Sequence, residues 1–180
     1  MLLSHLPNEL PLAQPIPLNL GWWGDASTSF GIGIVVGPFW AAWSWAPGFV
    51  IGPKKDFDIG WAEAVAVELG LRLLLHQDML RGSPQSSPKL LVRSDNAGVV
   101  TVVNKGRSRL RNTNAVLREI YLLLADHRIC LTAEHIPSRL NVTDALSRGD
   151  VAGFLAGFPS ATTQIRFSLP PHLASKLVSM

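Results

Sequence analysis

The chain has 180 residues, a length that suits one domain of ordinary size with short extensions. Hydrophobic residues make up 47% of it and charged residues only 16%, which excludes a disordered tail or an acidic linker. Because Cys130 is the one cysteine, an intramolecular disulfide framework, a cysteine-rich zinc module and a CxxC redox centre are also excluded.

The formal net charge of +3 is unevenly distributed along the chain. Residues 1–88 carry four Lys/Arg and seven Asp/Glu, whereas residues 89–148 carry ten and five. Four of these ten basic residues alternate with other residues in one short stretch, at Lys105, Arg107, Arg109 and Arg111. This stretch indicates a polyanion-binding face, and a solvated helix surface is the alternative.

The N-terminal part of the chain gives weaker patterns. Residues 1–19 contain four prolines and no helical or strand period, so we expect an extended arm. The first residues also lack the basic start of a secretory signal. The uncharged stretch 26–53 is long enough to span a membrane, but glycines and prolines interrupt it in the manner of strand turns. We therefore expect a soluble intracellular protein without a membrane partner, in the cytoplasm or the nucleus.

Three apolar runs separated by short turns predict an antiparallel meander over residues 20–27, 30–37 and 39–46. A proline-free stretch rich in Ala, Val, Leu and Glu then predicts a mostly buried helix over residues 59–77. A loop rich in Gly, Ser and Pro follows at residues 81–88 and separates this half of the chain from the next.

The second half alternates between strands and helices. We expect a strand, two helices, a strand and a short helix, in that order, over residues 89–95, 97–104, 112–127, 129–136 and 141–147. The order βββαβααβα predicts an α/β domain over residues 20–150, with helices packed on a five-stranded mixed sheet. Residues 151–180 contain three more prolines, and we expect them to be a linker or a loosely packed appendage.

Four carboxylates occupy positions where chemistry is plausible. Asp25 lies inside the first strand among apolar residues, where an unpaired charge is unfavourable unless a cation compensates it. Glu63 lies on the sheet-facing side of the long helix, given a rotation of 100° per residue. Asp95 ends a strand, and Asp144 lies in the last helix. For each of them, a cap, a turn or a helix-dipole contact is the alternative role.

Carboxylate oxygens are ligands for hard cations such as Mg²⁺ or Mn²⁺ rather than zinc. Two such ions about 4 Å apart suit phosphoryl transfer, in which one activates a water and the other stabilises the leaving oxygen. The sequence contains no GxxxxGK[ST] loop and no GxSxG motif, so it gives no support to an NTPase or a serine hydrolase.

Several segments resemble motifs of the ribonuclease H family. Gly24–Ser27 with residues 31–36 is similar to the family's first hairpin, and residues 61–67 resemble its glutamate-bearing helix. Residues 93–100 resemble the strand end that carries its second aspartate. Residues 135–149, HIPSRLNVTDALSRG, look like the closing motif in reverse transcriptases of retroelements and pararetroviruses. The resemblance covers residues 20–150.

This resemblance implies hydrolysis of the RNA strand of RNA–DNA hybrids with two Mg²⁺ or Mn²⁺ ions. Asp25 would bridge both ions, Glu63 and Asp95 would hold the leaving-group ion, and Asp144 the water-activating ion. Arg139 stands where the family often has a mobile histidine. His135, four positions earlier, is an auxiliary candidate for that role, and Ser27 is a second auxiliary candidate.

The resemblance and the basic stretch together suggest which residues contact the hybrid. The candidates carry amide or cationic groups that suit phosphate, sugar and 2′-OH contacts: Asn96, Asn104, Lys105, Arg107, Arg109, Arg111, Asn112 and Arg139. A reverse transcriptase domain of the same polyprotein is the expected protein partner.

Three other interpretations stay open. The chain could be a catalytically weak module of the same fold that binds nucleic acid or a polymerase domain. It could instead be a DNA-cleaving relative in the same superfamily, such as an integrase or a resolvase. In the third interpretation it is an unrelated α/β protein whose carboxylates are caps.

Overall fold

The computed structural model describes residues 16–81 and 87–180. Most of the N-terminal arm expected at residues 1–19 therefore lies outside the described residues, as does the centre of the loop at 81–88. Residues 18 and 19, which were expected in the arm, already belong to the first strand.

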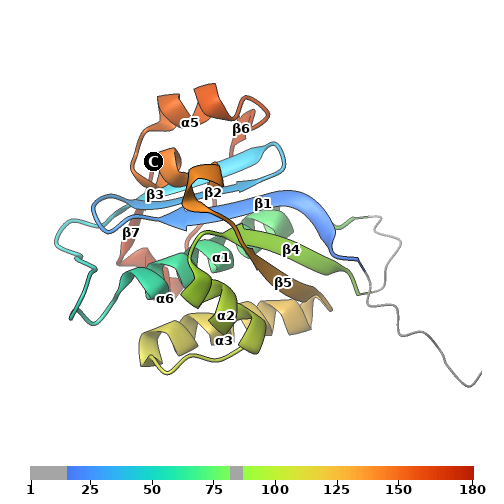
Figure 1. Cartoon of the computed structure of the whole chain (residues 1–180), viewed down its shortest axis with the longest axis horizontal. Coiled ribbons are helices and arrows are strands. Elements are labelled where there is room, and N and C mark those ends of the chain that lie inside the picture. The colour runs from blue at the N-terminus through green and yellow to red at the C-terminus, as the bar shows by residue number, and fades with distance from the viewer. Residues whose placement is uncertain (1–15, 82–86) are drawn as a thin grey trace, which may run out of the picture.

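Most of the expected elements are present, in the expected order (Figure 1). The first half forms β1 (Leu18–Ala26), β2 (Gly31–Val36), β3 (Phe39–Trp45) and α1 (Ile59–His76). The second half forms β4 (Lys89–Ser94), α2 (Ala97–Lys105), α3 (Arg111–Asp126) and β5 (Cys130–His135). The closing motif forms a 3-10 turn, η1 (Ser138–Leu140), and one turn of helix, α4 (Asp144–Ser147), so the expected last helix begins three residues late.

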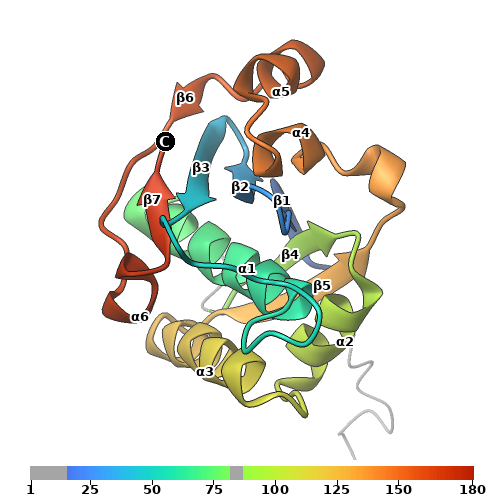
Figure 2. The same ribbon diagram turned by 90° about the vertical axis from the view of Figure 1, so that its left-hand side faces the viewer.

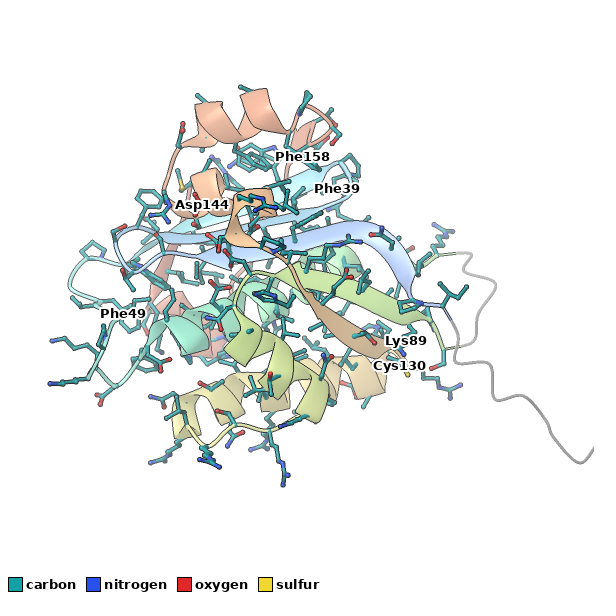
Figure 3. The ribbon with its side chains drawn as sticks, viewed as in Figure 1. Phe39, Phe49, Lys89, Cys130, Asp144 and Phe158 are labelled. Carbon is teal, nitrogen blue, oxygen red and sulfur yellow. The ribbon has the colours of Figure 1, made fainter. Side chains whose placement is uncertain are left out.

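The central strands form one mixed sheet in the order β5-β4-β1-β2-β3. Strands β1, β2 and β3 are antiparallel neighbours, whereas β4 runs parallel to β1 and β5 runs parallel to β4. The register of the last pair begins with Lys89 opposite Cys130, at the end of the sheet seen in Figure 3. This order and these directions confirm the predicted ribonuclease H-like fold of a mixed α/β sheet.

One layer of helices, α1, α2 and α3, lies against one face of the sheet (Figure 2). Helix α1 is buried along most of its length, from Trp61 to Leu74. It approaches β1 closely because Gly70 has no side chain: a Cβ there would lie 2.1 Å from the indole nitrogen of Trp22, which is fully buried. This close contact fixes how α1 lies against the strand that carries Asp25.

Residues 151–180 require a correction, because they pack on the domain rather than forming a linker or a loose appendage. They form α5 (Val151–Gly157), β6 (Thr163–Gln164), α6 (Pro171–Ala174) and β7 (Leu177–Ser179). Strand β6 pairs in parallel with the start of β3 and β7 pairs antiparallel with its end, so the described sheet has seven strands rather than five. Burial of Phe154, Leu173 and Leu177 supplies the free energy for this packing.

The second face of the sheet is covered in part by α4 and α5. Leu146 of α4 and Phe154 of α5 form a smaller apolar cluster with Val35, Trp40 and Ala42 of the sheet. This layer holds the closing motif against β1 and β2. In the described part of the chain, the helices fall short of the length and hydrophobicity needed to cross a membrane.

Candidate active site

Three of the four candidate carboxylates meet at one end of the central strands. Asp25 near the end of β1, Glu63 on α1 and Asp95 just after β4 each offer an oxygen, and these oxygens lie within 4.8 Å of one another. The side chains of Asp25 and Glu63 are buried, and that of Asp95 is partly exposed. Residues separated by 70 positions of sequence are thus brought together by the order of the strands.

Glycine in the sheet lets the closing motif reach Asp25. Asp25 is opposite Gly33 in the β1–β2 pair. A Cβ at Gly33 would lie 2.8 Å from both the Cβ of Leu146 and the backbone nitrogen of Ser147. The missing side chain therefore allows α4 to sit directly on this part of the sheet, beside the carboxylate.

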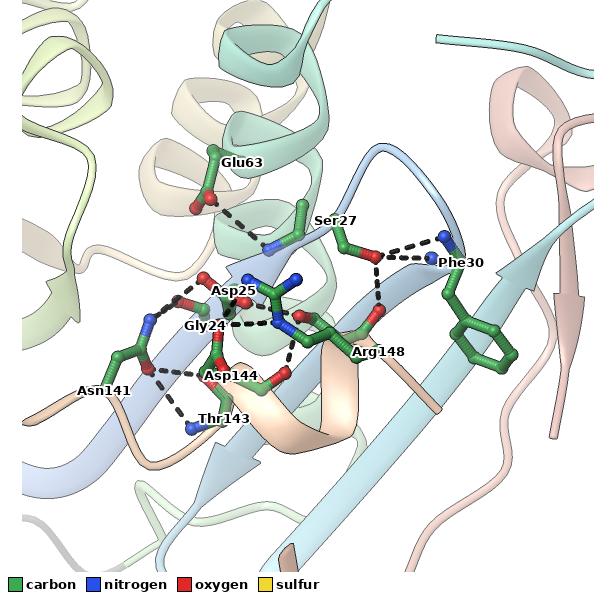
Figure 4. A network of polar contacts seen from close by, with 12 residues as sticks. Gly24, Asp25, Ser27, Phe30, Glu63, Asn141, Thr143, Asp144 and Arg148 are labelled. Carbon is green, nitrogen blue, oxygen red and sulfur yellow. Dashed lines mark hydrogen bonds and ion pairs between the residues drawn. The ribbon is translucent and has the colours of Figure 1, made fainter. Parts of the chain in front are cut away.

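Both oxygens of Asp25 accept hydrogen bonds from the closing motif (Figure 4). The Nδ2 of Asn141 donates to Oδ1 at 3.0 Å, and the hydroxyl of Ser147 donates to Oδ2. Asn141 is itself held by Thr143, whose backbone N–H and hydroxyl donate to the Asn141 Oδ1 at 3.2 and 2.7 Å. The buried residues Asn141, Thr143 and Ser147 therefore fix the orientation of Asp25.

Glu63 is oriented by the strand ends on either side of it. Its Oε1 accepts from the backbone N–H of Ala26 at 3.3 Å, and its Oε2 accepts from the hydroxyl of Ser94 at 3.4 Å. Five residues earlier, the side chain of Asp58 accepts from the N–H of Trp61 and caps the start of α1. The position of Glu63 is thus set by the helix start and by β1 and β4 together.

The cluster holds more negative charge than its surroundings stabilise. The pKa of Glu63 is raised to about 9, mainly by burial and in part by the neighbouring charges of Asp25 and Asp95. The pKa of Asp25 is raised to about 7, mainly by burial; the hydrogen bond from Ser147 lowers it, and the charges of Asp95 and Asp144 contribute to the rise. A cation bound among these oxygens would remove the penalty, and oxygen ligands at this spacing suit Mg²⁺ or Mn²⁺.

Asp144 lies next to the cluster but is not one of the three grouped carboxylates. It is the first residue of α4 and is partly exposed. Its Oδ1 accepts two hydrogen bonds from Arg148, from Nε and Nη2, each at 3.0 Å. Its charge nevertheless contributes to the raised pKa of Asp25. Asp144 is therefore electrostatically coupled to the site while it is paired with an arginine.

The three candidate asparagines make structural hydrogen bonds. Asn96 caps α2 by accepting from the N–H of Val99 at 3.1 Å, and Asn112 donates to the carbonyl of Asp56. Asn104 exchanges two hydrogen bonds with the backbone of Ala133, at 2.9 and 2.8 Å. The amide of Asn104 therefore holds α2 against β5, a role that the sequence interpretation did not assign to it.

The basic candidates line two hollows on the helical side of the site. One hollow, of about 670 Å³, includes Lys105, Arg107 and Arg109. The other, of about 530 Å³, lies between the starts of α1 and α3, and its lining includes Lys55, Asp56, Phe57, Asp58, Trp61, Leu110, Arg111, Asn112 and Thr113. The buried hydroxyl of Thr113 has no hydrogen-bond partner among the residues that the structure describes, so a polar group remains unpaired in this wall.

The remaining candidates lie around the closing motif. Arg139 is exposed in η1 and lines a third hollow, of about 310 Å³, that also includes Asp144 and Phe158. His135 lies at the end of β5, with its Nε2 3.1 Å from the backbone oxygen of Asp95. Ser27 donates to the backbone oxygen of Ser147 at 2.7 Å and accepts from two N–H groups of the β1–β2 turn. Ser27 therefore joins the hairpin to α4.

Sequence reasoning did not predict the contacts that three polar residues make with the carboxylates. Ser147 and Arg148 lie three and four positions after Asp144, which is the spacing of neighbours on a helix, so this spacing could have suggested them. Ser94 precedes Asp95, and its position facing α1 follows from strand alternation only when the direction of β4 is known.

Comparisons with known proteins give similarity at the level of architecture. No protein-family model and no curated protein sequence matches the chain. Among solved structures, RNase H1 of the halophilic archaeon Halobacterium salinarum NRC-1 has 16% identity and a TM-score of 0.47, with 73% of this chain and 96% of that chain covered. The N-terminal RNase H domain of a Mycobacterium tuberculosis protein has 18% identity and a TM-score of 0.42, with 78% and 94% covered.

Proposed function

We propose that the chain is a metal-dependent endonuclease that hydrolyses the RNA strand of RNA–DNA hybrids. The observation that carries the proposal is the convergence of Asp25, Glu63 and Asp95 from three separate elements to within 4.8 Å. Caps of strands and helices have no reason to meet in this way, because each of them serves only its own element. The interpretation as an unrelated α/β protein with scattered caps is therefore not supported.

The donor set of the site fits the proposed cofactor, two Mg²⁺ or Mn²⁺ ions. Asp25, Glu63 and Asp95 supply oxygen atoms only, and Asp144 can add a fourth carboxylate from α4. When bound, such ions activate the attacking water and stabilise the leaving oxygen of a phosphodiester. The raised pKa values of Asp25 and Glu63 reflect how unfavourable it is to ionise these buried, neighbouring carboxylates without a cation.

The residues of the closing motif keep the site organised for this reaction. Asn141 and Ser147 hold both oxygens of Asp25 in one orientation, so that the carboxylate does not have to be ordered when substrate and metal bind. Outside this motif, Ser94 and the backbone N–H of Ala26 each hold one oxygen of Glu63. The partly exposed Asp95 and Asp144 leave one side of the cluster open to a substrate.

The surroundings of the site support a nucleic-acid substrate. Hollows lined by Lys105, Arg107 and Arg109, and by Lys55 and Arg111, offer cationic groups to phosphates on the helical side. On the other side of Asp144, Arg139 lines the hollow beneath α5. A duplex that crosses the carboxylates could contact cations on both sides, without any reading of base sequence.

The proposed biological setting is the ribonuclease H module of a retroelement polyprotein, next to a reverse transcriptase domain. Its support is the closing motif of residues 135–149 in the sequence. In the structure, several polar residues of this motif contact the candidate carboxylates or each other, as Asn141 and Ser147 do with Asp25. Such a module would act wherever hybrids form during reverse transcription, inside the cell.

The proposal is tested with a labelled RNA–DNA hybrid in Mg²⁺ or Mn²⁺, with double-stranded RNA and double-stranded DNA as controls. Asp25→Asn and Asp95→Asn should reduce cleavage by about a hundredfold or more, because a metal ligand supplies several kcal/mol to the transition state. Asp126→Asn, which alters an exposed carboxylate on α3, is the matched control and should cleave like the wild type.

Other results would select the alternative functions. Equal inactivity of the wild type and both variants with either metal would refute the catalytic proposal. Salt-dependent binding of the hybrid without cleavage would identify a binding module, and cleavage of duplex DNA would identify a DNA-processing relative.

A further inference from the structure

Arg148 makes an unusual contact for a residue beside a cluster of acids. It follows the single turn of α4, and both of its hydrogen bonds to Asp144 end on the same oxygen, Oδ1. Among the described residues, the other oxygen of Asp144, Oδ2, has no hydrogen-bond partner within the chain, and Figure 4 shows the guanidinium close to both Asp144 and Asp25. The arginine is therefore bonded to the fourth carboxylate and lies close enough to Asp25 and Asp95 to interact with their charges.

The charge of Arg148 interacts with carboxylates of the cluster beyond its partner Asp144. Its hydrogen bonds with Asp144, together with the charges of Asp144, Asp25 and Asp95, raise the pKa of its guanidinium. In return, its charge lowers the pKa of Asp25, against the larger effect of burial. The guanidinium thus supplies part of the positive charge that the buried carboxylates lack.

The two partners of the ion pair are free to separate. The side chains of Arg148 and Asp144 are 61% and 47% exposed, and an exposed pair of this kind contributes little to stability. In contrast, Asp25 and Glu63 are buried and held by hydrogen bonds from several elements. A cation entering the cluster would therefore meet fixed ligands on one side and a releasable ligand on the other.

We propose that Arg148 is an internal counter-ion that holds Asp144 when the site has no metal, and that it must release Asp144 for this carboxylate to join the other three. Arg148 is then a positioning residue that sets how much divalent cation the site needs. This inference rests on the proposed function, because it assumes that the carboxylates hold a metal. It predicts that Arg148 and the cation compete for Asp144.

The competition is measured by titrating Mg²⁺ and Mn²⁺ into the full chain without nucleic acid, using calorimetry. Arg148→Gln should tighten metal binding about two- to fivefold, the factor that corresponds to an exposed ion pair. Arg148→Lys, which keeps the charge, should bind metal nearly as the wild type does. The matched control is Arg81→Gln, which removes an arginine that also lies near an aspartate, Asp78, three positions earlier.

A second measurement separates competition from a structural role. In EDTA, Arg148→Gln should unfold at a lower temperature than the wild type, and the difference should shrink in saturating Mg²⁺, where the ion pair is already broken. A merely structural arginine would lower the unfolding temperature equally in both conditions. Unchanged or weaker metal binding in Arg148→Gln would overturn the proposal.

The same titrations separate this inference from the proposed function. Tighter binding in Arg148→Gln, in a chain that does not cut the hybrid, would support the counter-ion and refute the nuclease. Cleavage by the wild type with identical metal affinity in Arg148→Gln would refute the counter-ion alone. A wild type that binds neither metal would overturn both.

Discussion

Divalent metal binding at the carboxylate cluster should release protons. The pKa is about 7 for Asp25 and about 9 for Glu63 in the metal-free chain. At pH 7, Asp25 is therefore about half protonated and Glu63 almost fully protonated, so a cation that needs both carboxylates ionised should expel about 1.5 protons. These protons come from residues that would be fully ionised at pH 7 if they were exposed to water.

The number of released protons determines how the affinity changes with pH. Near pH 7 the association constant for Mg²⁺ or Mn²⁺ should rise about thirtyfold per pH unit, and by pH 8 the rise should slow to about tenfold per unit as Asp25 becomes ionised. The assay is calorimetry in buffers with different heats of ionisation, such as phosphate and Tris. The dependence of the measured heat on the buffer gives the number of protons directly.

Two variants make this measurement specific to the cluster. Glu63→Gln removes the group with the highest pKa and should reduce the release at pH 7 to about half a proton, with weaker metal binding. Asp126→Asn should leave both quantities unchanged, since Asp126 is exposed on α3. A heat that does not depend on the buffer, or an equal release from Glu63→Gln and the wild type, would refute the reasoning.

Three further predictions concern stability. In EDTA, the free energy of unfolding should fall by several kcal/mol between about pH 5 and pH 9, as measured in calorimetric scans. The reason is that Asp25 and Glu63 have higher pKa values in the folded than in the unfolded chain, so the folded chain binds more protons. Gly33→Ala should lower the unfolding free energy by about 1–3 kcal/mol and reduce cleavage, because its Cβ would push α4 away from Asp25. Phe154→Ala should lower the free energy of unfolding in urea by about 3–5 kcal/mol, because this side chain of α5 is buried against the sheet.

Each of these predictions has its own control. Saturating Mg²⁺ should reduce the loss of stability at high pH, and a chain that grows more stable as the pH rises would contradict the sign. Gly157→Ala should be harmless, because a Cβ at this position meets nothing within 4 Å. Leu155→Ala, next to Phe154 but 37% exposed, should lower the stability by less than about 1 kcal/mol; an equal loss from both variants would contradict the packing argument.

The central part of the fold could be predicted because its residues follow clear periods. Strands β1 to β5 alternate or form short apolar runs between turns, and α1 has a long proline-free apolar pattern. The order of these elements places Asp25, Glu63 and Asp95 together where β1 and β4 end. The grouping of these three carboxylates could therefore also be predicted from the sequence.

The C-terminal part could not be predicted in the same way. Strand β6 has two residues and β7 has three, which is too short for any alternation to be recognised. Their pairing with β3 depends on long-range contacts such as the burial of Leu173 and Leu177 against the main core. A proline-rich stretch with isolated apolar residues therefore looked like a linker in the sequence.

The ion pair between Asp144 and Arg148 could not be predicted from the sequence for a different reason. The spacing of Asp144 and Arg148 allows an ion pair on a helix, but the same sequence also fits a metal ligand followed by a solvated arginine. Local spacing does not decide between these arrangements, because the answer depends on the charges that the rest of the fold brings nearby. The same holds for Asn104, whose partner Ala133 is 29 residues away.

The contact between Asn104 and Ala133 also affects how the protein behaves in a crowded solution. Strand β5 is an outer strand of the sheet, and an outer strand normally offers its backbone groups to strands of other molecules. Here the amide of Asn104 takes up both the N–H and the C=O of Ala133, as a neighbouring strand would. At the opposite edge, β6 and β7 together cover the two ends of β3. Another copy of the chain would have to displace Asn104 before it could pair along the whole of β5, and at the opposite edge it would meet the two- and three-residue strands β6 and β7 instead of the longer β3.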